Sequence, residues 1–177
     1  MLAVALILAL AEGRELIGTA PRDWEVSEWV QGGPLRLQDL RGRAVLVRFW
    51  TGPECPYCRT SAPYLTDWHA RYGPDGLVVV GLYHHKSAGP VTTRRVAELA
   101  RGLGFRFPVG IDQDWRTLRR WWLDGRDRDY TSVTFLLDRQ GVIRAIHPGG
   151  AYTRDEAARL EAEIRRLLGA AGPSADR

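Results

Sequence analysis

Two long apolar runs stand out in the hydrophobic pattern of the chain and predict its central strands. Residues 44–50 and 77–83 are nearly continuous apolar segments rich in valine and aromatic side chains. Runs of this length between turn residues are typical of strands buried on both faces. Residues 59–72, between the runs, have the pattern of a helix. Pro56 lies just before them and would fall in the first turn of that helix, where a missing N–H costs little. Together the three segments predict a β-α-β unit.

Shorter segments complete the predicted order of elements. The expected helices cover residues 92–103, 115–123 and 153–168, and the expected shorter strands cover residues 35–37, 107–111, 134–138 and 142–146. The last two strands flank a turn and predict a hairpin. Thr153 and Glu156 match a capping box at the start of the last helix. This order predicts a single α/β domain that a hairpin and a terminal helix complete.

The composition is that of an ordinary soluble globular protein. The 177 residues are 45% hydrophobic and 26% charged, and this length suits one domain. We expect the domain to cover residues 12–168, followed by a disordered tail over residues 169–177. The net charge of +4 is small and the arginines are scattered, which argues against a nucleic-acid binder.

The first eleven residues form a separate apolar segment. They have the length of the hydrophobic part of a signal peptide, and Ala9-Leu10-Ala11 fits a cleavage site. The segment predicts export to the periplasm or another extracytoplasmic space, and an uncleaved segment would hold the domain at the membrane. No lysine or arginine precedes it, so the alternatives are a short element packed on the domain or a misassigned start codon. Without a signal the chain would stay in the cytoplasm.

The two cysteines of the chain lie in one motif, Cys55-Pro56-Tyr57-Cys58, between the first strand and the helix. A C-x-x-C motif at such a junction is read first as a dithiol redox centre. Cys55 would lie exposed at the helix N-terminus, where the helix dipole favours the thiolate, and Cys58 would resolve the mixed disulfide. A static disulfide would gain little entropy from so short a loop, and no second C-x-x-C completes a zinc site. We therefore expect a redox role and no metal.

The order of elements and several motifs resemble the thioredoxin fold, in particular the exported TlpA/ResA-type thiol–disulfide oxidoreductases of the redoxin group. The matching segments are residues 45–50, 55–58, 63–65, 78–81, 107–112 and 134–141. The resemblance covers residues 17–168. It implies a three-layer α/β/α sandwich with a central mixed sheet and an N-terminal extension.

The resemblance also implies a function and a set of site residues. Proteins of this type reduce or exchange protein disulfides with electrons from an upstream donor, such as a membrane thiol carrier. No cofactor is implied beyond the redox-active disulfide of Cys55 and Cys58, and we expect a monomer. The residues expected to bind substrate or to shape the site flank the dithiol or lie in the loop that faces it: Trp50, Glu54, Pro56, Tyr57, Thr131, Ser132 and Val133.

Three positions depart from the pattern of these families. Ser132 stands where a cis-proline usually faces the dithiol, and a non-proline cis bond costs about 2.5–4 kcal/mol, so we expect a trans peptide. Arg48 stands on the strand where an acid is often found, so a buried acid that relays a proton is missing there. The loop before Cys55 is one residue longer than usual. The motif therefore identifies the chemistry better than the substrate.

Two polar segments lie near the expected rim of the site. His84 and His85 follow the second apolar run, but neighbouring residues of an extended segment point to opposite faces. We therefore expect ordinary loop residues rather than a copper or haem site. The charged run of residues 124–129 predicts a solvated loop, with a role in shaping the substrate groove as the alternative.

Two other functions are compatible with the motif. A peroxiredoxin-like thiol peroxidase needs Thr or Ser three residues before its reactive cysteine, and here that residue is Gly52, with Thr51 one place away. A non-catalytic thioredoxin-like binding module would keep its cysteines idle, and the absence of the proline at Ser132 favours this alternative. An idle Cys55 would titrate near or above the free thiol value of about 8.5.

Overall fold

A six-stranded mixed sheet forms the centre of the computed structural model, which describes residues 12–86, 91–128 and 130–169. The strands are β1 (Glu28–Gln31), β2 (Ala44–Trp50), β3 (Leu77–Tyr83), β4 (Val109–Ile111), β5 (Val133–Leu137) and β6 (Ile143–Pro148). Their order in the sheet is β1-β4-β3-β2-β5-β6. The β2, β3 and β4 strands run parallel, whereas β1, β5 and β6 are antiparallel to their neighbours.

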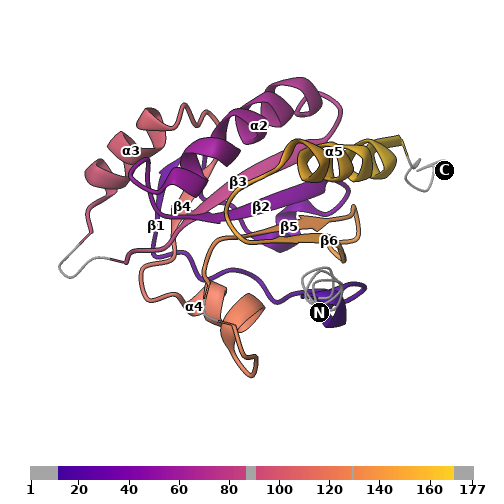
Figure 1. The fold of residues 1–177 in the computed structure, drawn as a ribbon, viewed down its shortest axis with the longest axis horizontal. Helices are drawn as coiled ribbons and strands as arrows, with labels where there is room; N and C mark the ends of the chain where they lie inside the picture. The colour runs from indigo at the N-terminus through magenta and orange to yellow at the C-terminus, as the bar shows by residue number, and fades with distance from the viewer. Residues whose placement is uncertain (1–11, 87–90, 129, 170–177) are drawn as a thin grey trace, which may run out of the picture.

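Helices cover both faces of this sheet. The helical segments are η1 (Arg14–Leu16), η2 (Leu37–Leu40), α2 (Pro56–Tyr72), α3 (Thr93–Gly102), α4 (Arg116–Leu118), the π-helical η3 (Arg119–Leu123) and α5 (Arg154–Gly169). In Figure 1, α2, α3 and α5 lie on one side of the sheet and α4 lies on the other. The predicted thioredoxin-like three-layer fold with a mixed sheet is confirmed.

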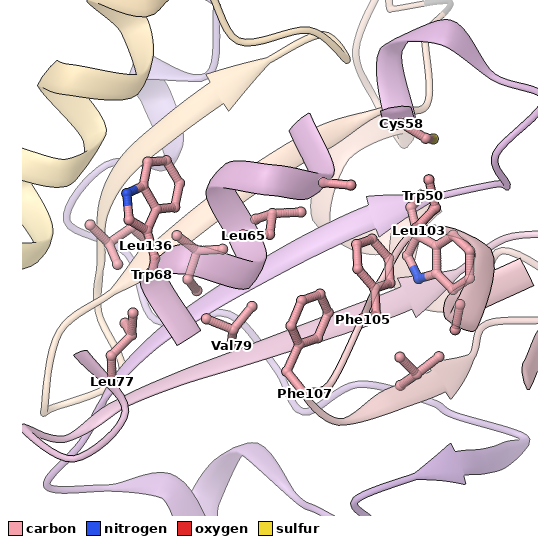
Figure 2. Packing of buried hydrophobic residues seen from close by; sticks show 14 of the residues in the cluster. Trp50, Cys58, Leu65, Trp68, Leu77, Val79, Leu103, Phe105, Phe107 and Leu136 are labelled. Carbon is pink, nitrogen blue, oxygen red and sulfur yellow. The ribbon is translucent and has the colours of Figure 1, made fainter. Parts of the chain in front are cut away.

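Strand β2 is buried along its whole length and divides two hydrophobic cores. Leu46 and Trp50 point into the core under α2, α3 and α5, part of which is shown in Figure 2. Val47 and Phe49 point into the second core, under α4 and η3. This alternation follows from the period of two in an extended strand, and burial on both faces explains why the whole segment is apolar apart from Arg48.

The errors among the predicted elements lie in the first forty residues. The strand predicted for residues 35–37 is wrong, because the chain enters η2 at Leu37, whose N–H donates to Asp23 Oδ1 at 2.8 Å. Strand β1, which was not predicted, pairs antiparallel with β4. It has only four residues, two of them Glu28 and Gln31, so it is too short and too polar to give a strand pattern.

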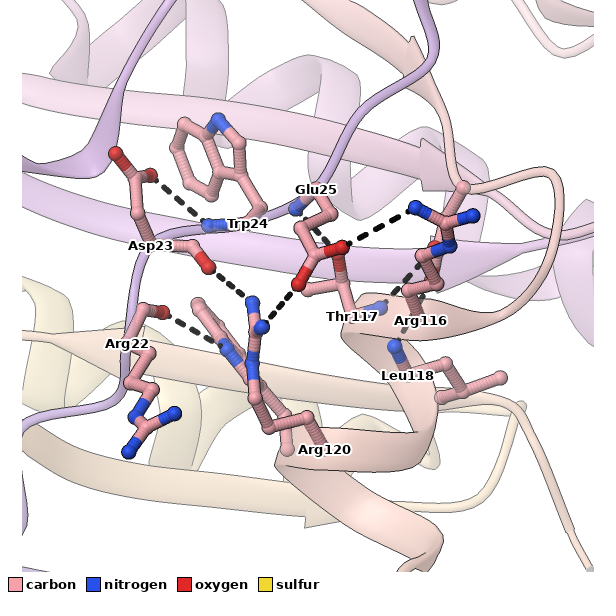
Figure 3. A network of polar contacts seen from close by, with 10 residues as sticks. Arg22, Asp23, Trp24, Glu25, Arg116, Thr117, Leu118 and Arg120 are labelled. Carbon is pink, nitrogen blue, oxygen red and sulfur yellow. Dashed lines mark hydrogen bonds and ion pairs between the residues drawn. The ribbon is translucent and has the colours of Figure 1, made fainter.

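The predicted N-terminal extension lies beside α4 and η3, as Figure 3 shows. Trp121 donates its Nε1–H to the carbonyl of Arg22 at 3.0 Å. Arg120 donates to the carbonyl of Asp23 and to the carboxylate of Glu25. These contacts hold η3 in place, and with it the start of the loop that returns to the sheet at β5.

Several predictions concern residues at the two ends of the chain. The apolar segment of residues 1–11 and residues 170–177 of the predicted tail lie outside the described residues. Gly169, predicted to begin the tail, is instead the last residue of α5. Within the described ranges, no helix combines the length and the apolar character needed to cross a membrane.

Candidate active site

The dithiol lies where β2 ends and α2 begins. Cys55 is the N-cap residue of α2, and Pro56 occupies the first position of the helix, as predicted. Cys55 is half-buried, whereas Cys58 is only 1% exposed and belongs to the core beneath the helix. Both cysteines are free thiols in this structure. The first sulfur is therefore accessible from outside, and the second lies behind it.

The surroundings of Cys55 favour its thiolate. Partial burial alone raises the pKa of a thiol, but here the backbone N–H of Cys58, its thiol, the Thr51 hydroxyl and the backbone N–H of Tyr57 together hold the pKa of Cys55 below its ordinary value. The Thr51 Oγ1 atom also lies 3.7 Å from the sulfur of Cys58. Donors gathered at a helix N-terminus are the arrangement that makes a cysteine reactive.

The residues that flank the motif differ in exposure. Trp50 is buried in the same core as Cys58, next to Phe105 (Figure 2). Its ring makes T-shaped contacts with Tyr83 and Phe105 at centroid distances of 5.2 and 5.1 Å. Glu54 is exposed and its carboxylate folds over Gly52. Trp50 therefore belongs to the same core as Cys58, while Glu54 faces solvent next to Cys55.

Tyr57 lies between the two cysteines and is 56% exposed. Its Cβ atom is so close to Gly150 that a methyl group on that glycine would lie 2.3 Å away. A turn after β6, which contains Gly150, thus supports the first turn of α2.

The predicted facing loop approaches the same end of the sheet. Strand β5 runs antiparallel to β2, with Thr134 opposite Arg48, so residues 131–133 lie beside the end of β2 from which the loop to Cys55 departs. Thr131 is buried, Ser132 is half-buried, and Val133 begins β5. The Thr131–Ser132 peptide is trans, as expected; among the described residues the cis bond is Gly33–Pro34.

The expectation that His84 is an ordinary loop residue is wrong. Its side chain is fully buried, its Nε2 atom lies 2.8 Å from Thr131 Oγ1, and its ring packs edge-to-face on Trp115 at 5.6 Å. Burial, followed by the charges of Lys86 and Arg48, lowers the pKa of His84 to about 3, so it is neutral at pH 7. The feature of the sequence that could have indicated this burial is the position of His84 directly after a continuous apolar strand. His85 is half-buried and its Nδ1 atom lies 2.9 Å from the Tyr83 hydroxyl.

Two arginines also occupy unexpected places. Arg48 is fully buried, and the atoms that accept its hydrogen bonds belong to Thr134, Gly149 and Gly150. Arg128 lies in the loop predicted to be solvated, but its side chain is only 7% exposed because the guanidinium stacks 3.7 Å above the Trp122 ring. That loop is therefore anchored to the second core at Arg128.

No group of three or more His, Cys, Asp or Glu side chains is placed to hold a metal ion in the described part of the chain. The chemistry available at the site is that of the two thiols. Cys55 can attack an external disulfide, and Cys58 is close enough to displace the adduct.

The family follows from comparison with known proteins. Residues 17–146 match the model of the AhpC/TSA family, which covers most of the chain. The chain belongs to the AhpC/TSA family. Within it, the predicted resemblance to ResA-type thiol–disulfide oxidoreductases is confirmed: the chain is 26% identical to the thiol-disulfide oxidoreductase ResA of Geobacillus thermodenitrificans over 145 residues, which cover 82% of this chain and 76% of ResA.

The chain is also similar to two further proteins. The protein DipZ of Mycobacterium tuberculosis is 31% identical over 163 residues, which cover 90% of this chain but only 22% of DipZ. The chain thus spans about a fifth of the length of that relative. A crystal structure of a thioredoxin-like superfamily protein has a TM-score of 0.70 and 27% identity, covering 87% of this chain and 99% of the other.

Proposed function

We propose that this domain is a thiol–disulfide oxidoreductase that acts through Cys55 and Cys58. The observation that carries the proposal is the pairing of a half-buried, thiolate-favouring Cys55 at the N-cap of α2 with a buried Cys58 one turn behind it. The similarity to ResA supports the same activity.

The reaction runs in two exchange steps. The Cys55 thiolate attacks one sulfur of a substrate disulfide, forms a mixed disulfide and releases one substrate thiolate, which takes up a proton. The thiol of Cys58 then loses its proton and attacks the sulfur of Cys55, which releases the second substrate thiol and leaves the Cys55–Cys58 disulfide. Two electrons have passed to the substrate. A donor dithiol restores the enzyme by the same exchange in reverse.

The proposal extends to the substrates, the electron donor and the location. Proteins with accessible disulfides are the substrate class, and a membrane thiol carrier is the donor that suits an exported domain. The electrons are held in the cysteine pair itself, so no bound cofactor is required. The apolar character of residues 1–11 and the resemblance to exported TlpA/ResA-type proteins are the grounds on which we propose an extracytoplasmic location.

The two alternative functions fit the site less well. The residue three positions before Cys55, where a peroxiredoxin-like peroxidase needs Thr or Ser, is Gly52, which has no hydroxyl. An idle binding module is disfavoured by the lowered pKa of Cys55. Consumption of hydrogen peroxide by Cys55 faster than reduction of a protein disulfide would favour the peroxidase.

Reduction of insulin with dithiothreitol as the electron donor tests the proposal. We expect turnover with the wild-type protein and a loss of at least about a hundredfold with Cys55→Ser, because the attacking thiolate is gone. A double variant, Cys55→Ser with Cys58→Ser, that retained the wild-type rate would refute the proposal.

A trapping experiment assigns the two roles. Cys58→Ser should accumulate a covalent adduct between Cys55 and a substrate cysteine, since the resolving thiol is missing. Cys55→Ser is the matched control and should accumulate none. Mass spectrometry of the non-reduced protein distinguishes the two results, and an adduct on Cys58 in the Cys55→Ser variant would reverse the assignment.

A further inference from the structure

Arg48 carries a positive charge in the centre of the fold. The residue is 0% exposed, on a strand buried along its whole length. The guanidinium group of arginine stays protonated in proteins. A buried charge of this kind is costly unless an opposite charge or several hydrogen bonds compensate it.

The hydrogen-bond partners of Arg48 are all neutral. Its guanidinium donates to Thr134 Oγ1 at 3.1 Å, to the carbonyl of Gly149 at 3.1 Å and to the carbonyl of Gly150 at 2.6 Å. It also lies 5.4 Å from the centre of the Tyr152 ring. Among the described residues no carboxylate forms an ion pair with it, and its Nε atom has no partner. The charge is hydrogen-bonded but not neutralised.

This charge lies on the side of the sheet that α2 covers. Arg48 belongs to the same face of β2 as Leu46 and Trp50, the face that the core containing Cys58 covers. One of its acceptors, Gly150, is in close contact with Tyr57, which separates the two cysteines. The guanidinium thus contacts Gly150, and Gly150 contacts the first turn of α2, which carries the dithiol.

Three titratable groups of this part of the core lie near enough to Arg48 for its charge to contribute to their pKa shifts. Burial is the main cause of the lowered pKa of His84 and of His147, and the charge of Arg48 lowers both further. Burial raises the pKa of the Tyr152 hydroxyl, and the charge of Arg48 opposes that rise. In the interior of a protein, charges are screened much less than at its surface.

We propose that Arg48 shifts the redox equilibrium of the dithiol. Its buried charge favours the reduced form of the pair, with Cys55 as the thiolate, and so makes the pair more oxidising. The inference rests on the redox role of Cys55 and Cys58 proposed above. Exposed Glu54 and Arg59 flank the motif and carry opposite charges, so their contributions are solvent-screened and of opposite sign.

The equilibrium with glutathione measures this effect directly. Glutathione disulfide takes two electrons from the dithiol: its S–S bond breaks, the Cys55–Cys58 bond forms, and the two protons leave on two glutathione thiols. A charge that stabilises the thiolate disfavours this oxidation. Removing the charge should therefore raise the equilibrium constant for oxidation.

Arg48→Met removes the charge and keeps the length of the side chain. We expect its equilibrium constant for oxidation by glutathione disulfide to rise about tenfold, which corresponds to a potential about 30 mV lower. The pKa of Cys55, followed by thiolate absorbance, should rise in the same variant. Arg94→Met, at an exposed position on α3, makes the same change in net charge and should leave both values unchanged.

A second pair of variants keeps Arg48 and changes the residue beside its guanidinium. Thr134→Asp places a carboxylate on the Thr134 side of the guanidinium and should shift the equilibrium in the same direction as Arg48→Met. Thr134→Asn is nearly the same size, carries no charge and should stay within about threefold of wild type. This pair keeps the test valid if Arg48→Met does not fold.

The outcomes separate the two proposals. If the wild-type protein forms no Cys55–Cys58 disulfide in the glutathione buffer, the proposed function fails. If the wild type equilibrates but Arg48→Met and Thr134→Asp keep its equilibrium constant, only the role of Arg48 is overturned. A shift that Thr134→Asp and Thr134→Asn share would assign the effect to packing instead of charge.

Discussion

Tyr57 and Gly150 are in contact at the edge of the dithiol, and the contact leaves no room for a side chain at position 150. We expect Gly150→Ala to push on Tyr57 and to tilt the first turn of α2, lowering the rate of insulin reduction severalfold. The stability cost should be that of overpacking, about 1–3 kcal/mol. Thermal unfolding and the insulin assay measure the two effects.

Gly149→Ala is the matched control for that variant. Gly149 has a φ of 88°, which strains any other residue, but a methyl group there meets no atom within 4 Å. We expect it to cost about 1 kcal/mol of stability and to leave activity nearly unchanged. Equal loss of activity in the two variants would argue that flexibility of the turn, not the Tyr57 contact, matters.

His84 should make the stability of the protein depend on pH. Its pKa is about 3 when folded and about 6.5 when unfolded, so below pH 6.5 only the unfolded chain takes up the proton. The free energy of unfolding should therefore fall between pH 6.5 and 3, with a slope that approaches about 1.4 kcal/mol per pH unit. Above pH 6.5 this dependence disappears.

Urea unfolding of the wild type and of His84→Gln at several pH values checks this prediction. The variant lacks the titrating imidazole and therefore this pH dependence. Between pH 7 and pH 4.5 the free energy of unfolding of the wild type should fall by about 2–3 kcal/mol more than that of His84→Gln. The lowered pKa values of His69 and His147 affect both proteins equally. Parallel curves would mean that His84 is protonated in the folded protein.

At the scale of the elements, helix α5 shows how local chemistry fixes a boundary. The N–H of Thr153 donates to Glu156 Oε2 at 2.8 Å, and the N–H of Glu156 donates to Thr153 Oγ1 at 3.2 Å, which confirms the predicted capping box. We expect Thr153→Ala to lower the free energy of unfolding by about 1 kcal/mol. Glu156→Gln keeps both hydrogen bonds and should cost less. Urea unfolding compares the two variants.

The elements that could be predicted from sequence are those whose pattern is set by local rules. The apolar runs gave β2 and β3, and the capping box gave α5 to within a residue. Strand β1 could not be predicted, because pairing with β4 holds four residues without an apolar pattern of their own. Residues 35–37 have the pattern of a short strand but do not form one, because the Leu37 N–H donates to the Asp23 carboxylate and the chain turns into η2.

The site itself was predictable only in part. The dithiol and its helix follow from spacing and turn chemistry, both local properties. The burial of Arg48 and of His84 depends on Thr131, Thr134 and the Gly149–Gly150 turn, which lie 47 to 102 positions farther along the chain. A single sequence does not show which distant segments meet, so these environments require the structure.

At the scale of the whole molecule, Arg120 joins the N-terminal segment to η3 through Asp23 and Glu25 (Figure 3). The Arg120–Glu25 pair is partly exposed, so Arg120→Ala should lower global stability by less than about 1 kcal/mol. Amide exchange near Glu25 should nevertheless become faster, because local opening is easier. Arg116→Ala, which removes a longer and more exposed contact to Glu25, should change exchange less.

The region that matches the family model ends at residue 146, and this boundary divides the surroundings of Arg48. Its acceptor on β5 lies inside the matched region, but the carbonyls of Gly149 and Gly150 and the ring of Tyr152 lie just beyond it. A truncated protein ending at residue 146 would retain both cysteines and lose most of the groups that solvate the guanidinium. A unit that keeps the surroundings of Arg48 intact must therefore extend past the turn to at least Tyr152.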